Sequence, residues 1–148
     1  MVGHVDPTRE ARAAFRALPA DQPIAMINLL RFRETAAYPA DHPDHAAGRT
    51  GAEAYAAYGR AAAAPFARSA GTQIWLGRPE LTLIGADEVW DLAFIARYET
   101  AEAFLAMLHD PEYQQAVIHR QAAVADSRLI RCRPQDAGAG FGETRDKP

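Results

Sequence analysis

The residues best suited to chemistry lie in three places: a histidine-rich loop, a polar position inside an apolar strand, and a helix with an arginine among apolar side chains. The loop contains Asp41-His42-Pro43-Asp44-His45, whose imidazole and carboxylate groups are ligands that zinc uses. Zinc sites need rigid spacing, and five residues around a proline in a long loop are more typical of a solvated turn. We therefore expect no metal site and no cofactor.

Asn28 and Arg120 each have a structural and a functional interpretation. A buried amide such as that of Asn28 must find hydrogen-bond partners or cost about 1–3 kcal/mol, so it bonds either neighbouring backbone or a ligand. Arg120 shares a helical stripe with Tyr113 and Val117. Its guanidinium reaches water, pairs with a carboxylate, or holds an anionic ligand by a bidentate contact. His119 lies on a different side of the same helix and is expected at the surface.

Aromatic residues supply the apolar walls that a small-molecule site needs. Such rings stack on a flat ligand or pack into a core or interface, and both interpretations stay open. If one pocket exists, its predicted ligand-binding residues are Asn28, Tyr55, Trp75, Trp90, Phe94 and Arg120. The arginine favours an anionic or polar-headed ligand. The loop from Glu34 to Arg49 follows the Asn28 strand and is placed to close over the site as a lid.

Several kinds of chemistry are disfavoured by composition. Fifteen of the sixteen basic residues are arginines, and the one lysine, Lys147, lies beside the C-terminus, which is a poor place for a Schiff base. Neither Ser69 nor Ser127 sits in a G-x-S-x-G motif. A net charge of −3 argues against generic nucleic-acid binding. One cysteine, Cys132, and the absence of a signal or spanning segment predict a cytoplasmic protein without membrane contact.

The pattern of apolar residues and turns predicts one α+β domain. Helices are expected to begin at Asp6-Pro7, at the Thr50–Glu53 capping box, at Thr100 and at Asp110-Pro111. Strands are expected over 24–33, 72–84 (one bent strand around Pro79), 89–98 and 127–133. The order βαββαβ is typical of a ferredoxin-like antiparallel sheet with helices on one face. We divide the chain into an accessory helix at 1–23, the domain at 24–133 and a mobile tail at 134–148.

Two strands, 24–33 and 89–98, are apolar on both faces, and this predicts a dimer. Helices cover one face of the sheet, and a large apolar patch is rarely left exposed on a monomer, so a second copy is the simplest cover. We expect the smaller aliphatic set to face the helices: Ile27, Leu29, Ile74, Leu76, Ala93 and Ile95. The bulkier set is expected to face the partner: Met26, Asn28, Leu30, Phe32, Trp75, Trp90, Leu92 and Phe94.

Short motifs in this order resemble the domain of unknown function 1330 family. They are Met26–Arg33, Ala54–Gly59, Trp75–Pro79, Asp110–Tyr113, His119-Arg120 and Asp126–Ile130. The resemblance implies a dimeric α/β barrel in which two ferredoxin-like sheets face each other, and it implies no established reaction. Many members have a glutamate before the glycine of the second strand, where this chain has Ile84, so any role of that carboxylate is absent here.

Two functions of different classes therefore remain, beside a third, weaker interpretation as a haem or metal protein that uses a histidine of the loop. The first is a dimeric small-molecule-binding protein, or a cofactor-free enzyme, acting on a small organic acid or aromatic compound. The alternative is a non-catalytic dimerisation or interaction domain. An enclosed cavity with convergent polar groups favours the first function, and a filled core favours the second.

Overall fold

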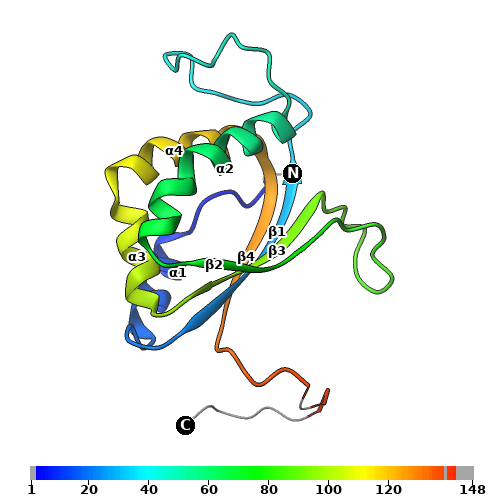
Figure 1. Ribbon diagram of the computed structural model, residues 1–148. Helices are drawn as coiled ribbons and strands as arrows, with labels where there is room; N and C mark the ends of the chain where they lie inside the picture. Colours follow the sequence, from blue (N-terminus) through cyan, green and yellow to red (C-terminus); the bar gives the residue numbers. More distant parts are fainter. Residues whose placement is uncertain (1–2, 139, 143–148) are drawn as a thin grey trace.

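Four antiparallel strands form one sheet in the order β2-β3-β1-β4 (Figure 1). The computed structural model describes residues 3–138 and 140–142. Its strands are β1 (Ile24–Phe32), β2 (Thr72–Gly77), β3 (Leu92–Tyr98) and β4 (Val124–Cys132), and its helices are α1 (Arg9–Ala17), α2 (Gly51–Arg68), α3 (Ala101–His109) and α4 (Pro111–Ala123). The predicted α+β ferredoxin-like fold is confirmed, with β1 and β3 in the centre of the sheet.

Helices α2, α3 and α4 begin where their sequence signals predict, whereas α1 begins at Arg9 after its N-cap Thr8 and not at the predicted Asp6-Pro7. Thr50 and Glu53 form a reciprocal capping box at the start of α2, and the side chains of Thr8, Thr100 and Asp110 accept hydrogen bonds from the first turns of α1, α3 and α4. Asp110 ends α3 and caps α4, so one residue sets the angle between them. These caps satisfy backbone N–H groups that no helical carbonyl can reach. No helix within the described residues is long and apolar enough to cross a membrane.

The predicted second strand is wrong beyond Gly77. β2 ends there and β3 begins at Leu92, so residues 78–91 form a loop that extends beyond the sheet (Figure 1). Pro79 has no N–H to continue the ladder with β3. As a result, Leu81, Leu83 and Ile84 are 81%, 86% and 92% exposed. Residues 139 and 143–148 of the tail expected at 134–148 lie outside the described residues, and the others form neither helix nor strand.

The two faces of the sheet are also assigned the wrong way round for β1 and β3. Met26, Asn28 and Leu30 are buried on the side of the helices, and their cross-strand partners are Ala96, Phe94 and Leu92. The smaller residues face the other way: Ile27, Leu29, Ala93 and Ile95. The reason is complementarity of size. The helices present alanines, including Ala54, Ala57, Ala62 and Ala116, so large side chains of the sheet fill the space above them.

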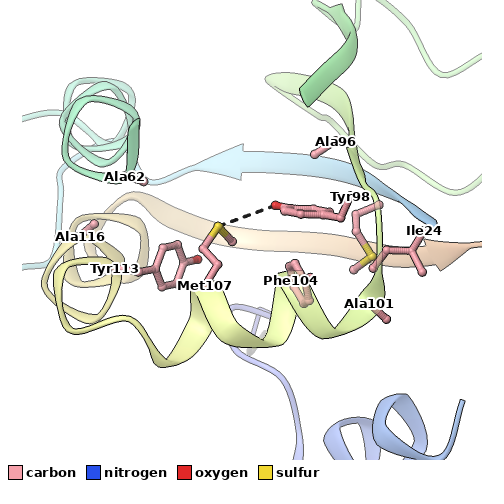
Figure 2. Packing of buried hydrophobic residues seen from close by; sticks show 10 residues of the cluster. Ile24, Ala62, Ala96, Tyr98, Ala101, Phe104, Met107, Tyr113 and Ala116 are labelled. Atoms are coloured by element: carbon pink, nitrogen blue, oxygen red, sulfur yellow. Dashed lines mark hydrogen bonds between the residues drawn. The ribbon is translucent and has the colours of Figure 1, made fainter. Parts of the chain in front are cut away.

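The core under α3 and α4 is rich in aromatic and sulfur-containing side chains. Figure 2 shows Phe104 and Met107 of α3 and Tyr113 of α4 around Tyr98 of the sheet. The rings of Tyr98 and Phe104 lie 5.1 Å apart, edge to face, and the Tyr98 hydroxyl lies 4.0 Å from the Met107 sulfur. A second cluster surrounds Leu30, Tyr38 and Val124 at the other end of the sheet. Between these clusters the core is not filled.

Candidate functional site

A cavity of about 750 Å³ lies between the concave face of the sheet and the helices. The sheet contributes Met26, Asn28, Leu92, Phe94 and Leu129 to its lining, and the helices contribute Tyr55, Tyr58, Phe104, Tyr113, Val117 and Arg120. The N-terminal segment of residues 4–7 and helix α1 form a further wall. Such a volume, with apolar walls and a few polar groups, is the size of an ordinary small-molecule site.

Arg120 is held at the wall of this cavity by two hydrogen bonds. Its Nη1 donates to the carbonyl of Val5 at 2.6 Å and its Nη2 donates to the hydroxyl of Ser127 at 3.3 Å. Ser127 in turn donates to the carbonyl of His4 at 2.7 Å. The guanidinium therefore ties α4 to both β4 and the N-terminal segment. Its observed acceptors are a neutral carbonyl and a hydroxyl, and it forms no ion pair among the described residues.

Three tyrosines, Tyr55, Tyr58 and Tyr113, line the same cavity. The hydroxyls of Tyr58 and Tyr113 lie 3.0 Å apart, and the ring of Tyr55 lies 5.2 Å from that of Tyr58. Burial raises the pKa of Tyr55, Tyr58 and Tyr113, and the nearby charge of Arg120 opposes this shift in all three. The hydroxyls stay protonated at neutral pH, so they are available as hydrogen-bond donors beside the arginine.

Asn28 makes the backbone bond that one of its two interpretations predicted, and it also lines the cavity. Its side chain is 8% exposed and lines the cavity, and its Nδ2 donates to the carbonyl of Met26 at 3.1 Å. Within residues 3–138 and 140–142, its Oδ1 accepts no hydrogen bond. The amide is thus anchored to its own strand and keeps a free acceptor at the cavity wall.

Four of the six predicted site residues border this one cavity, and two do not. Asn28, Tyr55, Phe94 and Arg120 line it together. Trp75 is 53% exposed on the opposite face of the sheet, with its indole across Gly77. Trp90 lies in the loop of residues 78–91, and the guanidinium of Arg128 lies 5.2 Å over its ring. A common pocket for all six residues is therefore not observed.

The cavity is covered by the N-terminal segment and not by the loop predicted as a lid. No residue of 34–49 lines it. Instead, Arg131 of β4 holds the turn after α1 through bonds to the carbonyls of Phe15 (3.2 Å) and Pro19 (2.6 Å), and it lies 4.6 Å over the Phe15 ring. Burial lowers the pKa of Arg131. Sequence reasoning missed this wall, although Ala11, Phe15 and Leu18 share one face of the predicted first helix and were a signal for it.

The loop of residues 34–49 folds against α4, where it brings His42 and Asp44 beside His119. The side chain of His119, predicted at the surface, is only 16% exposed, and its Nδ1 lies 2.6 Å from the hydroxyl of the buried Tyr38. Burial lowers the pKa of His119, and the neighbouring carboxylate of Asp44 opposes that shift. This cluster is separate from the cavity, whose lining includes none of its members.

Comparison with known proteins gives a family and close structural relatives. Residues 48–131 match the model of Domain of unknown function (DUF1330). The crystal structure of the RPA0582 protein of unknown function from Rhodopseudomonas palustris is 52% identical, with a TM-score of 0.83 over 91% of this chain and 99% of that chain. Its methylated form, also 52% identical, has a TM-score of 0.85 over 93% and 99%.

A more distant likeness is to a dimeric protein of unknown function and ferredoxin-like fold from Bacteroides fragilis NCTC 9343. It is 13% identical, with a TM-score of 0.46 over 75% of this chain and 95% of that chain. No curated protein matches the chain.

Proposed function

The chain belongs to the DUF1330 family of domains of unknown function, and from the geometry of its cavity we propose that it binds a small organic ligand. The observation that carries this proposal is a cavity of about 750 Å³ whose mainly apolar lining includes Arg120, Asn28 and three tyrosines. A domain that served only as a scaffold for dimerisation would gain stability from filling this space, since closely packed interiors are the rule.

The polar groups of the cavity favour a ligand with an anionic or strongly polar head and an apolar or aromatic body. The guanidinium of Arg120 bonds the backbone carbonyl of Val5, which a carboxylate can replace with a stronger, charge-assisted bond. Because the hydroxyls of Tyr58 and Tyr113 bond each other, one of the two keeps its proton free to donate to the same head group. Phe94, Phe104 and Leu92 then provide the surface against which the body of the ligand packs.

The same proposal includes pairing of two chains through the face of the sheet that the helices leave open. Ile27 and Ile95 are direct cross-strand neighbours in the middle of that face. At the edge strand and in the loop beside it, Trp75, Leu81, Leu83 and Ile84 are each more than half exposed. A second copy covers this apolar surface most simply, as in a dimeric α/β barrel. We place the dimer in the cytoplasm, where the reducing environment keeps a single cysteine in its thiol form.

Titration with 2-naphthoate and with its neutral amide, 2-naphthamide, tests the ligand proposal. Isothermal calorimetry should show one naphthoate per chain. The amide should bind more weakly by about tenfold or more, because a hydrogen bond to a charged group contributes roughly 1.5–3 kcal/mol.

Two adjacent alanines of α2 supply a matched pair of variants. Ala62 lines the cavity and Ala63 is exposed on the outer side of the helix. Ala62→Phe should abolish naphthoate binding by filling the cavity, and Ala63→Phe should leave it unchanged. If neither probe binds the unmodified chain, or if Ala62→Phe binds naphthoate normally, the cavity is not a ligand site.

A further inference from the structure

Outside the cavity, a second group of side chains offers atoms that bind metal ions. His42, Asp44 and His119 each present one ligand atom, and these three atoms lie within 4.8 Å of one another. Two of the residues come from the loop of residues 34–49 and the third from α4, so tertiary structure alone assembles the group. All three side chains are partly buried, which limits competition from bulk water.

The loop that carries two of these residues is held in place by specific bonds. Tyr38 is 6% exposed, its ring stacks on that of His42 at 4.9 Å, and its hydroxyl lies 2.6 Å from Nδ1 of His119. One nitrogen of Arg49 donates both to the Tyr38 hydroxyl at 3.1 Å and to Asp44 Oδ2 at 3.0 Å. The spacing that looked too loose in the sequence is therefore fixed by a buried tyrosine and an arginine.

We propose that His42, Asp44 and His119 form a binding site for a divalent transition-metal ion of the Zn²⁺ type. Two imidazole nitrogens and one carboxylate oxygen are a donor set that such ions prefer to the harder Mg²⁺ and Ca²⁺. Three protein ligands leave a fourth position for water, as in open zinc sites. This inference departs from the expectation of no metal, which was based on the loop alone.

The arrangement around the ligands fits an ion after adjustments of the side chains. Zinc–ligand bonds of about 2 Å at tetrahedral angles place two ligand atoms about 3.3 Å apart, so the group must close by up to about 1.5 Å. Nδ1 of His119 faces the Tyr38 hydroxyl oxygen, and a metal-bound imidazole typically donates its other N–H to such an acceptor. Arg49 bonds Oδ2 of Asp44, and this same oxygen lies 3.9 Å from Nδ1 of His119, so binding the ion through the other Asp44 oxygen and Nε2 of His119 requires both side chains to rotate.

Metal binding by His42 requires the loss of one hydrogen bond that the ring makes in the metal-free protein. Its Nδ1 accepts a hydrogen bond from the backbone N–H of Asp44 at 3.0 Å, so a neutral ring in this orientation bears its proton on Nε2. Coordination through Nε2 moves that proton to Nδ1, and the amide of Asp44 loses its acceptor. We therefore expect a site of moderate affinity that fills and empties with the supply of metal, and not one that the fold requires.

Calorimetric titration of the tag-free, metal-stripped full chain with ZnCl₂ tests the site. Cys132→Ser serves as the background, so that the single thiol cannot bind the ion. One Zn²⁺ per chain is expected, and His42→Asn or His119→Asn should weaken its binding at least about tenfold. His45→Asn is the matched control, because His45 lies in the same turn and bonds the Tyr38 carbonyl at 2.9 Å but is not one of the three ligands.

NMR of the imidazole protons is a second test that needs no histidine variant, so its result does not depend on whether those variants fold. Zn²⁺ should shift the signals of His42 and His119 in the Cys132→Ser chain and leave those of His4 and His109 in place. The proposal is overturned if no Zn²⁺ binds, if the shifted signals belong to other histidines, or if the His45 variant loses binding as much as the two ligand variants.

Discussion

Two adjacent residues of β3 should have different effects when each is replaced by aspartate: one substitution should disrupt the dimer, and the other should destabilise the fold. Phe94 faces the helices and lines the cavity, and Ile95 faces the open side of the sheet beside Ile27. If two chains pair through that side, Ile95→Asp should give a folded monomer. Phe94→Asp should lower the stability of the fold itself.

The size of both effects follows from burial. Loss of an isoleucine that is buried in the interface removes about 1.5–3 kcal/mol from the free energy of dimer formation. A two-fold interface contains this residue twice, so the dissociation constant of the dimer should rise by about 10²- to 10⁴-fold. Truncation of a buried phenylalanine costs about 3–5 kcal/mol before any charge is counted. In a domain of this size, that loss lowers the melting temperature by roughly 6 °C or more.

Sedimentation equilibrium with thermal unfolding separates the two outcomes. The unmodified chain should sediment at twice its mass of 16.1 kDa, and Ile95→Asp should sediment at that mass with near-native circular dichroism. Ile95→Val is the conservative control and should stay dimeric. An unmodified chain that is monomeric at micromolar concentration, or an Ile95→Asp variant that pairs as tightly as the parent, refutes the interface.

Three further outcomes follow from contacts described above. Arg120→Met should release the N-terminal segment, because it removes the bond to the Val5 carbonyl, and native-state hydrogen exchange should become faster at Val5 and its neighbours. The same variant should lower the free energy of unfolding, measured in urea, by about 1.5–3 kcal/mol. Unchanged exchange would show that other contacts hold the segment. Thr50→Ala should destabilise the domain by about 1 kcal/mol in the same assay, because α2 loses the acceptor of its capping box; Ala52→Ser, in the exposed first turn, is its control.

The third outcome concerns pH. Since the folded state lowers the pKa of His119 below 6.5, the unfolded chain binds its proton first, and stability should fall as pH drops through 6.5 toward the lower native value. Melting temperatures of the metal-stripped chain between pH 8 and pH 5 should therefore fall less for His119→Gln than for the parent; equal slopes would contradict the assigned cause.

The chain order of elements and the family were readable from local signals. Thr50 with Glu53, Thr100, and Asp110 with Pro111 mark helix starts because capping depends on residues only a few positions apart. The two-faced strands identified the centre of the sheet because apolar periodicity is local as well. Residues 81–84 misled the same reasoning: they are apolar, but β-structure needs a partner strand, and after Pro79 none is available.

Tertiary structure alone decided which side of the sheet the helices cover. Both faces of β1 and β3 are apolar, so periodicity could not distinguish them, and the choice depends on the alanines that the helices bring opposite Met26, Leu30 and Phe94. That choice placed Asn28, Tyr55 and Arg120 around one cavity and left Trp75 and Trp90 outside it. It also brought His119 of α4 to His42 and Asp44, residues separated from it by more than seventy positions, a distance over which local pattern carries no information.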